Sequence, residues 1–239
     1  MSVPDAPDAP EASVESLYPF LYAGATDLDA VLAAVRRSTA EKAEEIVALR
    51  REVLDRDGAG IAACARVLAD AFATGARLFA FGNGGSATDA QDVAALFLSP
   101  GFLPDGEATT PLPAFALTGD VAVVTALSND VGFEVVFARQ LAASGRAGDI
   151  AFGLSTSGNS RNLVAAFEEA DRRGMTTVGL AGYDGGQMAE LGTVDHLFVV
   201  PSSSVHRIQE AQTTVYHVLW ELTQHALARY GAPVGSDSS

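Results

Sequence analysis

Two short segments combine glycine with hydroxyl-bearing residues in a pattern that suits anion binding. They are Gly82-Asn-Gly-Gly-Ser86 and Ser155-Thr-Ser-Gly-Asn-Ser160. Each follows a short apolar run and precedes a helical pattern. A helix N-terminus presents free N–H groups and the positive end of its dipole, and glycine lets the backbone approach a ligand closely. We therefore expect these segments to bind a small anion. The alternative for either segment alone is a simple turn.

The second segment is the more informative because it carries four hydroxyl groups in six residues: Ser155, Thr156, Ser157 and Ser160. It lacks the lysine of a Walker A loop and the G-x-G-x-x-G spacing of a dinucleotide site. The pattern therefore favours a phosphomonoester over a nucleotide, and we expect no nucleotide cofactor.

Five short apolar runs, the first of them followed by glycines, are typical of buried strands. Helical patterns separate most of them, so the sequence predicts βαβ units and a parallel sheet covered on both faces. The fold class is α/β, a three-layer αβα sandwich with a five-stranded parallel sheet and N-terminal helices. Ligands bind such sheets at the carboxyl ends of strands, where both segments fall. The expected strands are 77–81, 113–117, 149–154, 176–180 and 196–200, and the expected helices are 88–98, 120–127, 133–143, 161–173 and 207–230.

An apolar stripe with spacings of three and four residues precedes the sheet. It runs from Leu28 to Val53 and is interrupted by Thr39 and Lys42. Ser38 and Glu41 could form a capping box that divides it into two helices. A further amphipathic helix is expected over 57–74. The stripe is either an ordinary amphipathic helix packed on its own sheet or a subunit interface.

Composition narrows the classes of function. The 239 residues are 48% hydrophobic and carry a formal net charge of −15, which disfavours direct nucleic-acid binding. The single cysteine, Cys64, is expected in the core, and a chain without disulfides suits a reducing cytosol. We expect no membrane span and no signal peptide, and therefore a cytoplasmic protein.

The chain divides into four expected segments. Residues 1–16 form an acidic, disordered tail, and 17–56 form an N-terminal helical segment. Residues 57–230 form the main domain, and 231–239 form a second disordered tail.

The two small-residue segments together resemble the sugar isomerase (SIS) domain, in particular its phosphoheptose (sedoheptulose 7-phosphate) isomerase branch. Further motifs that match in order and spacing are Asn129-Asp130-Val-Gly-Phe133, Gly182-Tyr-Asp-Gly-Gly186 and Arg207-Ile-Gln-Glu210. The resemblance covers about residues 57–230.

The resemblance implies roles for the matching positions. Ser155, Thr156, Ser157 and Ser160 would hold a sugar phosphate, and Asn83, Ser86, Asp130 and Gln209 would contact the substrate. It also implies a homotetramer with sites at subunit interfaces. Zinc often binds there through a histidine and a glutamate four apart on the first helix, and a glutamine and a histidine eight apart on the last.

This sequence departs from that pattern on the first helix. Gln209 and His217 are kept, but Asp92 stands at the histidine position and Leu96 at the position of the catalytic glutamate. Leu96 can neither accept a proton nor bind metal. We therefore expect His217 and Asp92 to carry the acid–base chemistry, and Asp92, Gln209 and His217 to offer a zinc site.

Each of these residues also has a structural interpretation. Asp92 could stabilise a helix N-terminus, His217 could pack near Trp220, and Gln209 could be a surface residue. Three functions follow. The first is an aldose–ketose isomerase of sedoheptulose 7-phosphate or a related sugar phosphate, in carbohydrate metabolism. The others are a non-catalytic phosphosugar sensor and a protein-binding homologue resembling the replication-initiator-associating protein of the superfamily.

Overall fold

The computed structural model describes residues 28–99 and 101–231, with side chains up to residue 228. The acidic tail expected over 1–16 therefore lies outside the described residues, as does the expected C-terminal tail beyond Gly231. The chain separates into two compact units, one ending at Glu45 and one beginning at Ile46.

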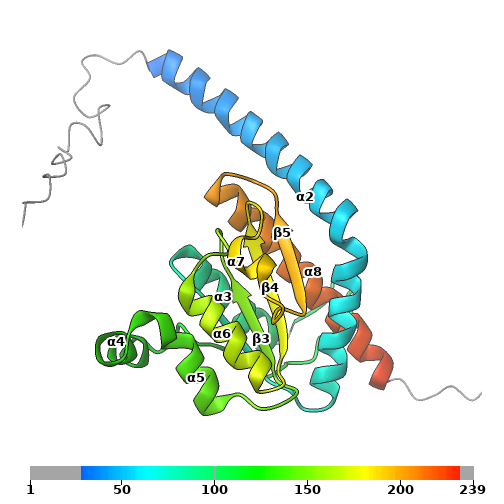
Figure 1. The fold of residues 1–239 in the computed structure, drawn as a ribbon. Coiled ribbons are helices and arrows are strands. Elements are labelled where there is room, and N and C mark those ends of the chain that lie inside the picture. The colour runs from blue at the N-terminus through cyan, green and yellow to red at the C-terminus, as the bar shows by residue number, and fades with distance from the viewer. Residues whose placement is uncertain (1–27, 100, 232–239) are drawn as a thin grey trace, which may run out of the picture. The chain divides into compact units, whose positions relative to one another are not determined.

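The second unit contains the predicted five-stranded parallel sheet, which confirms the expected fold class. Its strand order is β2-β1-β3-β4-β5, and every pairing is parallel. Figure 1 shows β3, β4 and β5 side by side. The central strands are fully buried because helices cover both faces of the sheet. The strands are β1 (Leu78–Gly82), β2 (Ala114–Ala116), β3 (Ile150–Leu154), β4 (Thr176–Gly182) and β5 (His196–Val200).

Alternate strand residues enter two separate cores. In β1, Leu78 and Ala80 pack into the core beneath α2, α3 and α8, whereas Phe79 and Phe81 pack into the core beneath α5, α6 and α7. This alternation follows from the two-residue period of a strand. The helices are α3 (Gly85–Leu98), α4 (Val121–Asp130), α5 (Val136–Ser144), α6 (Arg161–Arg172), α7 (Gly186–Glu190) and α8 (Val205–Gly231), with a 3-10 turn, η2, at Phe133–Val135.

The helix α2 (Leu28–Ala73) corrects one expectation. Its 46 residues are helical without interruption, so neither Ser38 nor the region around Gly58 divides it. The hydroxyl of Thr39 donates to the carbonyl of Val35 at 2.8 Å, a bond that keeps this polar residue within the helix. Glycine inside a helix costs only about 1 kcal/mol, which packing of Leu49 and Val53 into the core can offset.

Two further expectations concern Cys64 and membrane-spanning helices. Cys64 is fully buried on α2 and is a free thiol, as predicted. Among the described residues, no helix has both the length and the apolar character that crossing a bilayer requires.

Candidate functional site

The two small-residue segments lie side by side at the carboxyl edge of the sheet. They follow β1 and β3, which are neighbours, with Gly82 in register with Leu154. From β1 the chain continues to β2 on one side of the sheet, and from β3 it continues to β4 on the other side. The crevice between the ends of β1 and β3 is therefore the position where sheets of this type bind ligands. Asn83 and Asn162 join the two segments through paired amide hydrogen bonds of 2.8 and 2.9 Å.

Internal hydrogen bonds hold the serine-rich turn 155–160. The Ser155 hydroxyl is buried and accepts the N–H of Gly158 at 3.0 Å, while its carbonyl accepts from the amide of Gln212 on α8 at 2.8 Å. Gly158 has a φ of 66°, and a Cβ there would lie 1.9 Å from the carbonyl oxygen of Gly185. Glycine is therefore required, because both the conformation and the space exclude a side chain.

The remaining hydroxyls of this turn are available to a ligand. Ser157 accepts the N–H of Asn159 at 3.2 Å and keeps its own proton free to donate. Ser160 is the N-cap of α6, but its side chain makes no capping bond. The turn thus presents hydroxyl protons beside the first N–H groups of α6, an arrangement suited to a phosphate group.

The first turn, 82–86, leads into α3 and meets α8. Gly84 adopts a φ of 57°, and Ser86 is buried. A Cβ on Gly85 would lie 2.2 Å from Nε2 of Gln209, so the glycine makes room for that amide. Gln209 therefore lies against the turn at the start of α3.

A hollow of about 460 Å³ lies between α3, α8 and the loop after α3. It brings together three of the positions singled out in the sequence, Asp92, Leu96 and His217. His217 is exposed, and its ring stacks on buried Tyr216 with centroids 5.1 Å apart. Trp220 also lines the hollow, and its Nε1 is buried without a hydrogen-bond partner in the described residues. The hollow is lined by Asp92, Ala95, Leu96, Ser99, Gly101, Phe102, Thr213, Tyr216, His217 and Trp220.

Gln209 is not part of this lining. Its amide instead acts on the ionisation of Asp89. Burial, and next the negative charge of Asp92, raise the pKa of Asp89 to about 6, although the hydrogen bond from Gln209 acts in the opposite direction. One Asp89 oxygen is buried without a partner in the described residues. Sequence reasoning missed Asp89, although it lies one helical turn before Asp92.

Asp130 lies apart from the hollow. It is exposed at the end of α4, where its carboxylate accepts from the amide of Asn129 at 2.8 Å. None of the residues of α4 is buried, and the helix stands to the side of the sheet next to α5 (Figure 1). Asp130 is not among the residues that line the hollow with His217.

The sheet order, the helices on both faces and the two turns at the switch point define a doubly wound α/β protein. The model of the SIS domain family matches residues 43–182. That span is more than half of the chain, and the chain belongs to the SIS domain family.

Curated relatives and solved structures agree with this assignment. A phosphoheptose isomerase from Roseiflexus sp. is 42% identical over 187 residues, covering 78% of this chain and 92% of the relative. One from Geobacter sulfurreducens is 44% identical over 177 residues, covering 74% and 90%. The structure of a phosphoheptose isomerase from Neisseria gonorrhoeae superposes with a TM-score of 0.72 at 33% identity, covering 80% of this chain and 99% of that one.

Proposed function

We propose that this protein is an aldose–ketose isomerase that acts on a sugar phosphate, sedoheptulose 7-phosphate or a related compound. The observation that carries the proposal is that one helix, α8, contacts both the serine-rich turn and the hollow that contains His217 and Asp92. The helix α8 contacts the turn through Gln212 and lines the hollow through Thr213 and His217. The names of the relatives support the same reaction class.

The turn 155–160 would bind the phosphate group. Free hydroxyl protons and the N–H groups at the start of α6 are donors for phosphate oxygens, and Ser155 shapes the turn. Gln212 and His217 are separated by about 7.5 Å along the helix axis. Because residues five apart point about 140° apart around a helix, a sugar phosphate held at the turn would have to pass around α8, by way of Asn83 and Ser86, to reach the hollow.

His217 would carry out the proton transfer. Isomerisation removes the proton from the carbon beside the carbonyl, forms an enediol, and returns a proton to the neighbouring carbon. The imidazole of His217 can accept and return this proton, and Asp92 lies in the same hollow to act with it. Leu96 lines the same hollow as His217 and Asp92, but its side chain has no proton to exchange.

A zinc ion on Asp92, Gln209 and His217 stays a prediction from the resemblance. Among the described residues, Asp92 and His217 line the hollow, whereas Gln209 is not in its lining. Two donors are fewer than the three protein ligands of catalytic zinc sites. The donor set as it stands does not fit zinc, and the proposed proton transfer uses no metal.

We also propose a cytoplasmic homotetramer. In the unit that ends at Glu45, the apolar side chains of Val31, Leu32 and Val35 are 41%, 45% and 55% exposed. An exposed apolar stripe on a helix favours burial against other subunits. Light scattering that finds only a monomer would contradict this part of the proposal.

The decisive experiment incubates the pure protein with sedoheptulose 7-phosphate and follows the appearance of heptose 7-phosphate, with and without added zinc. We expect turnover that His217→Ala abolishes, while sugar-phosphate binding measured by calorimetry persists. Tight binding without any turnover would instead identify a phosphosugar sensor. If the protein neither binds nor converts the sugar phosphate, the remaining function is that of a protein-binding homologue.

A further inference from the structure

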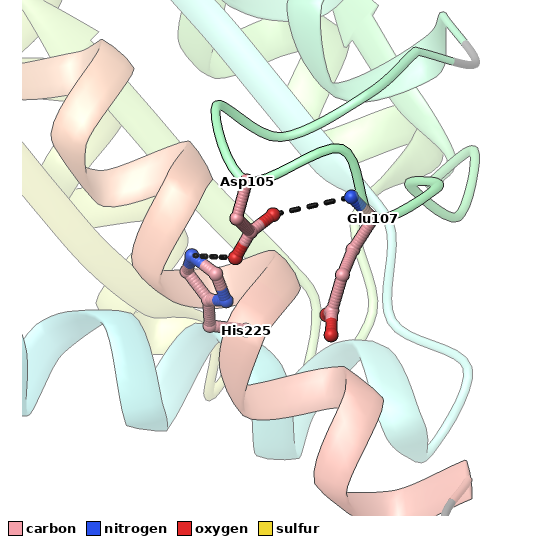
Figure 2. Close-up of side chains that lie close together, drawn as sticks. All are labelled: Asp105, Glu107 and His225. Atoms are coloured by element: carbon pink, nitrogen blue, oxygen red, sulfur yellow. Dashed lines mark hydrogen bonds and ion pairs between the residues drawn. The ribbon is translucent and has the colours of Figure 1, made fainter.

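Outside the hollow, three side chains with metal-binding chemistry converge at a second place on α8. They are Asp105 and Glu107, from the loop after α3, and His225. One ligand atom from each lies within 4.8 Å of the others. Figure 2 shows both carboxylates extending from the loop on the side that faces α8 and His225. An imidazole and two carboxylates from separate elements form a mixed donor set that sequence spacing did not reveal.

The separation of the donors suits a shared cation. Oδ2 of Asp105 and Nε2 of His225 are 3.9 Å apart, which is too far for a hydrogen bond. Two ligand atoms of a tetrahedral Zn²⁺, each at about 2.0–2.1 Å from the ion, are about 3.4 Å from one another. A bound ion would therefore draw this pair together by about 0.5 Å, a movement that side-chain rotation can supply.

The framework of this cluster is fixed independently of any ion. Gln224, which is buried and precedes His225, holds Thr110 through two hydrogen bonds of 2.9 Å each. Within the loop, the N–H of Leu103 donates to the carbonyl of Glu107 at 2.8 Å. The N–H of Glu107 in turn donates to Oδ1 of Asp105, which directs Oδ2 toward the histidine (Figure 2). The donors are thus held near a common point.

Charge also favours a cation at this place. Two carboxylates lie together, and the described side chains that pair with them include His225 but no lysine or arginine. One imidazole nitrogen with two carboxylate oxygens matches Zn²⁺ better than Mg²⁺ or Ca²⁺, which prefer oxygen ligands alone. Three protein ligands leave a fourth position for water.

We propose that Asp105, Glu107 and His225 form a binding site for a divalent transition-metal ion, represented by Zn²⁺. The ion would fasten the loop to α8. The same loop supplies Gly101 and Phe102 to the hollow that contains His217, so the ion would also fix one rim of that hollow. The site contains none of the proposed catalytic residues, and the inference does not depend on the proposed function.

The test is calorimetric titration of ZnCl₂ into the metal-stripped full-length protein carrying Asp92→Asn and His217→Ala, which remove donors from the hollow. We expect one bound zinc per chain. Adding His225→Ala or Asp105→Asn should weaken its affinity at least about tenfold, whereas His206→Ala, at an exposed histidine of the same helix, should leave it unchanged.

Thermal unfolding separates metal binding from folding. With chelator present, His225→Ala should unfold at the same temperature as its parent, and zinc should stabilise only the parent. Zinc binding that survives His225→Ala, or no zinc uptake by the parent, would overturn the proposal. If the parent variant fails to fold, wild type and His225→Ala are compared directly, and an unchanged zinc stoichiometry would overturn it equally.

Discussion

Asn83 and Asn162 exchange two side-chain hydrogen bonds, each Nδ2 donating to the Oδ1 of the other at 2.8 and 2.9 Å. Asn83 belongs to the turn after β1, and Asn162 is buried in the first turn of α6. The pair therefore ties together the two turns proposed to bind sugar and phosphate.

Replacing Asn162 with alanine should separate these turns. We expect a loss of about 1–3 kcal/mol in the free energy of unfolding, because the amide of Asn83 loses both partners. Sugar-phosphate affinity should fall as well. Urea unfolding and calorimetry measure the two effects. Glu168→Gln, at an exposed position of the same helix, serves as the control and should change stability by less than about 0.5 kcal/mol. Equal behaviour of the two variants would contradict the role assigned to the pair.

The serine-rich turn should lose phosphate affinity without losing its shape when its available hydroxyls are removed. Ser157→Ala with Ser160→Ala should weaken sugar-phosphate binding at least about tenfold, the equivalent of one or two hydrogen bonds to a charged group. Circular dichroism should remain unchanged, because the turn is held by Ser155 and Gln212. Unchanged affinity would remove this turn from the site.

Leu96→Glu should restore a carboxylate inside the hollow. Since a positioned base typically contributes about 10²–10⁴-fold, the variant should raise a weak isomerase activity or create an absent one. Leu96 is partly buried against the core, so the glutamate should also lower thermal stability and titrate above its ordinary pKa. Turnover is followed with sedoheptulose 7-phosphate. Leu96→Gln, which adds a polar group without a base, should not reproduce the gain.

His217→Ala and Asp92→Asn test the proton transfer in the wild-type background. His217→Ala should abolish turnover, and Asp92→Asn should reduce it, while phosphate binding persists at the separate turn. Robust turnover that survives both substitutions would refute the proposed mechanism.

The ion pair of Arg77 and Asp149 predicts how stability depends on pH. Burial opposes ionisation of Asp149, but hydrogen bonds from the Arg77 side chain and backbone and from Arg146 outweigh it and lower the pKa of this carboxyl. A carboxyl with a depressed folded pKa stabilises the protein above its unfolded pKa, near 4, and this contribution is lost as pH falls toward the folded value. Urea unfolding between about pH 6 and pH 3 should show the loss. Asp149→Asn should flatten this dependence, whereas Asp171→Asn should not.

The thiol of Cys64 should not react in the folded protein. Burial, with a smaller contribution from the charge of Asp195, raises its pKa to about 12, so almost no thiolate exists near neutral pH. Iodoacetamide labelling followed by mass spectrometry should detect modification only under unfolding conditions. Labelling of the native protein at the rate of an exposed thiol would contradict the buried position.

The amino-acid sequence by itself determined the strands of this protein and the two small-residue turns that follow β1 and β3. These depend on local signals, namely short apolar runs, and glycine and hydroxyl-bearing residues before a helix. Spacing along single helices also placed Asp92 and Leu96 on one face, and both line the same hollow. Local periodicity did not indicate that the stripe from Leu28 and the next helix form one continuous helix, α2. The packing of the C-terminal half of α2 outweighs the cost of Gly58 and of the possible caps.

Only the tertiary structure decided which side chains meet between elements. The packing of α8 on α3 places Gln209 against Gly85 and outside the lining of the hollow. It also half-buries the carboxylate of Asp89, which belongs to no motif identified in the sequence. The same helix brings His225 to Asp105 and Glu107 of a distant loop. Such contacts depend on how the helices pack on the sheet, and the order of residue types along the chain does not specify the distances between side chains of different elements.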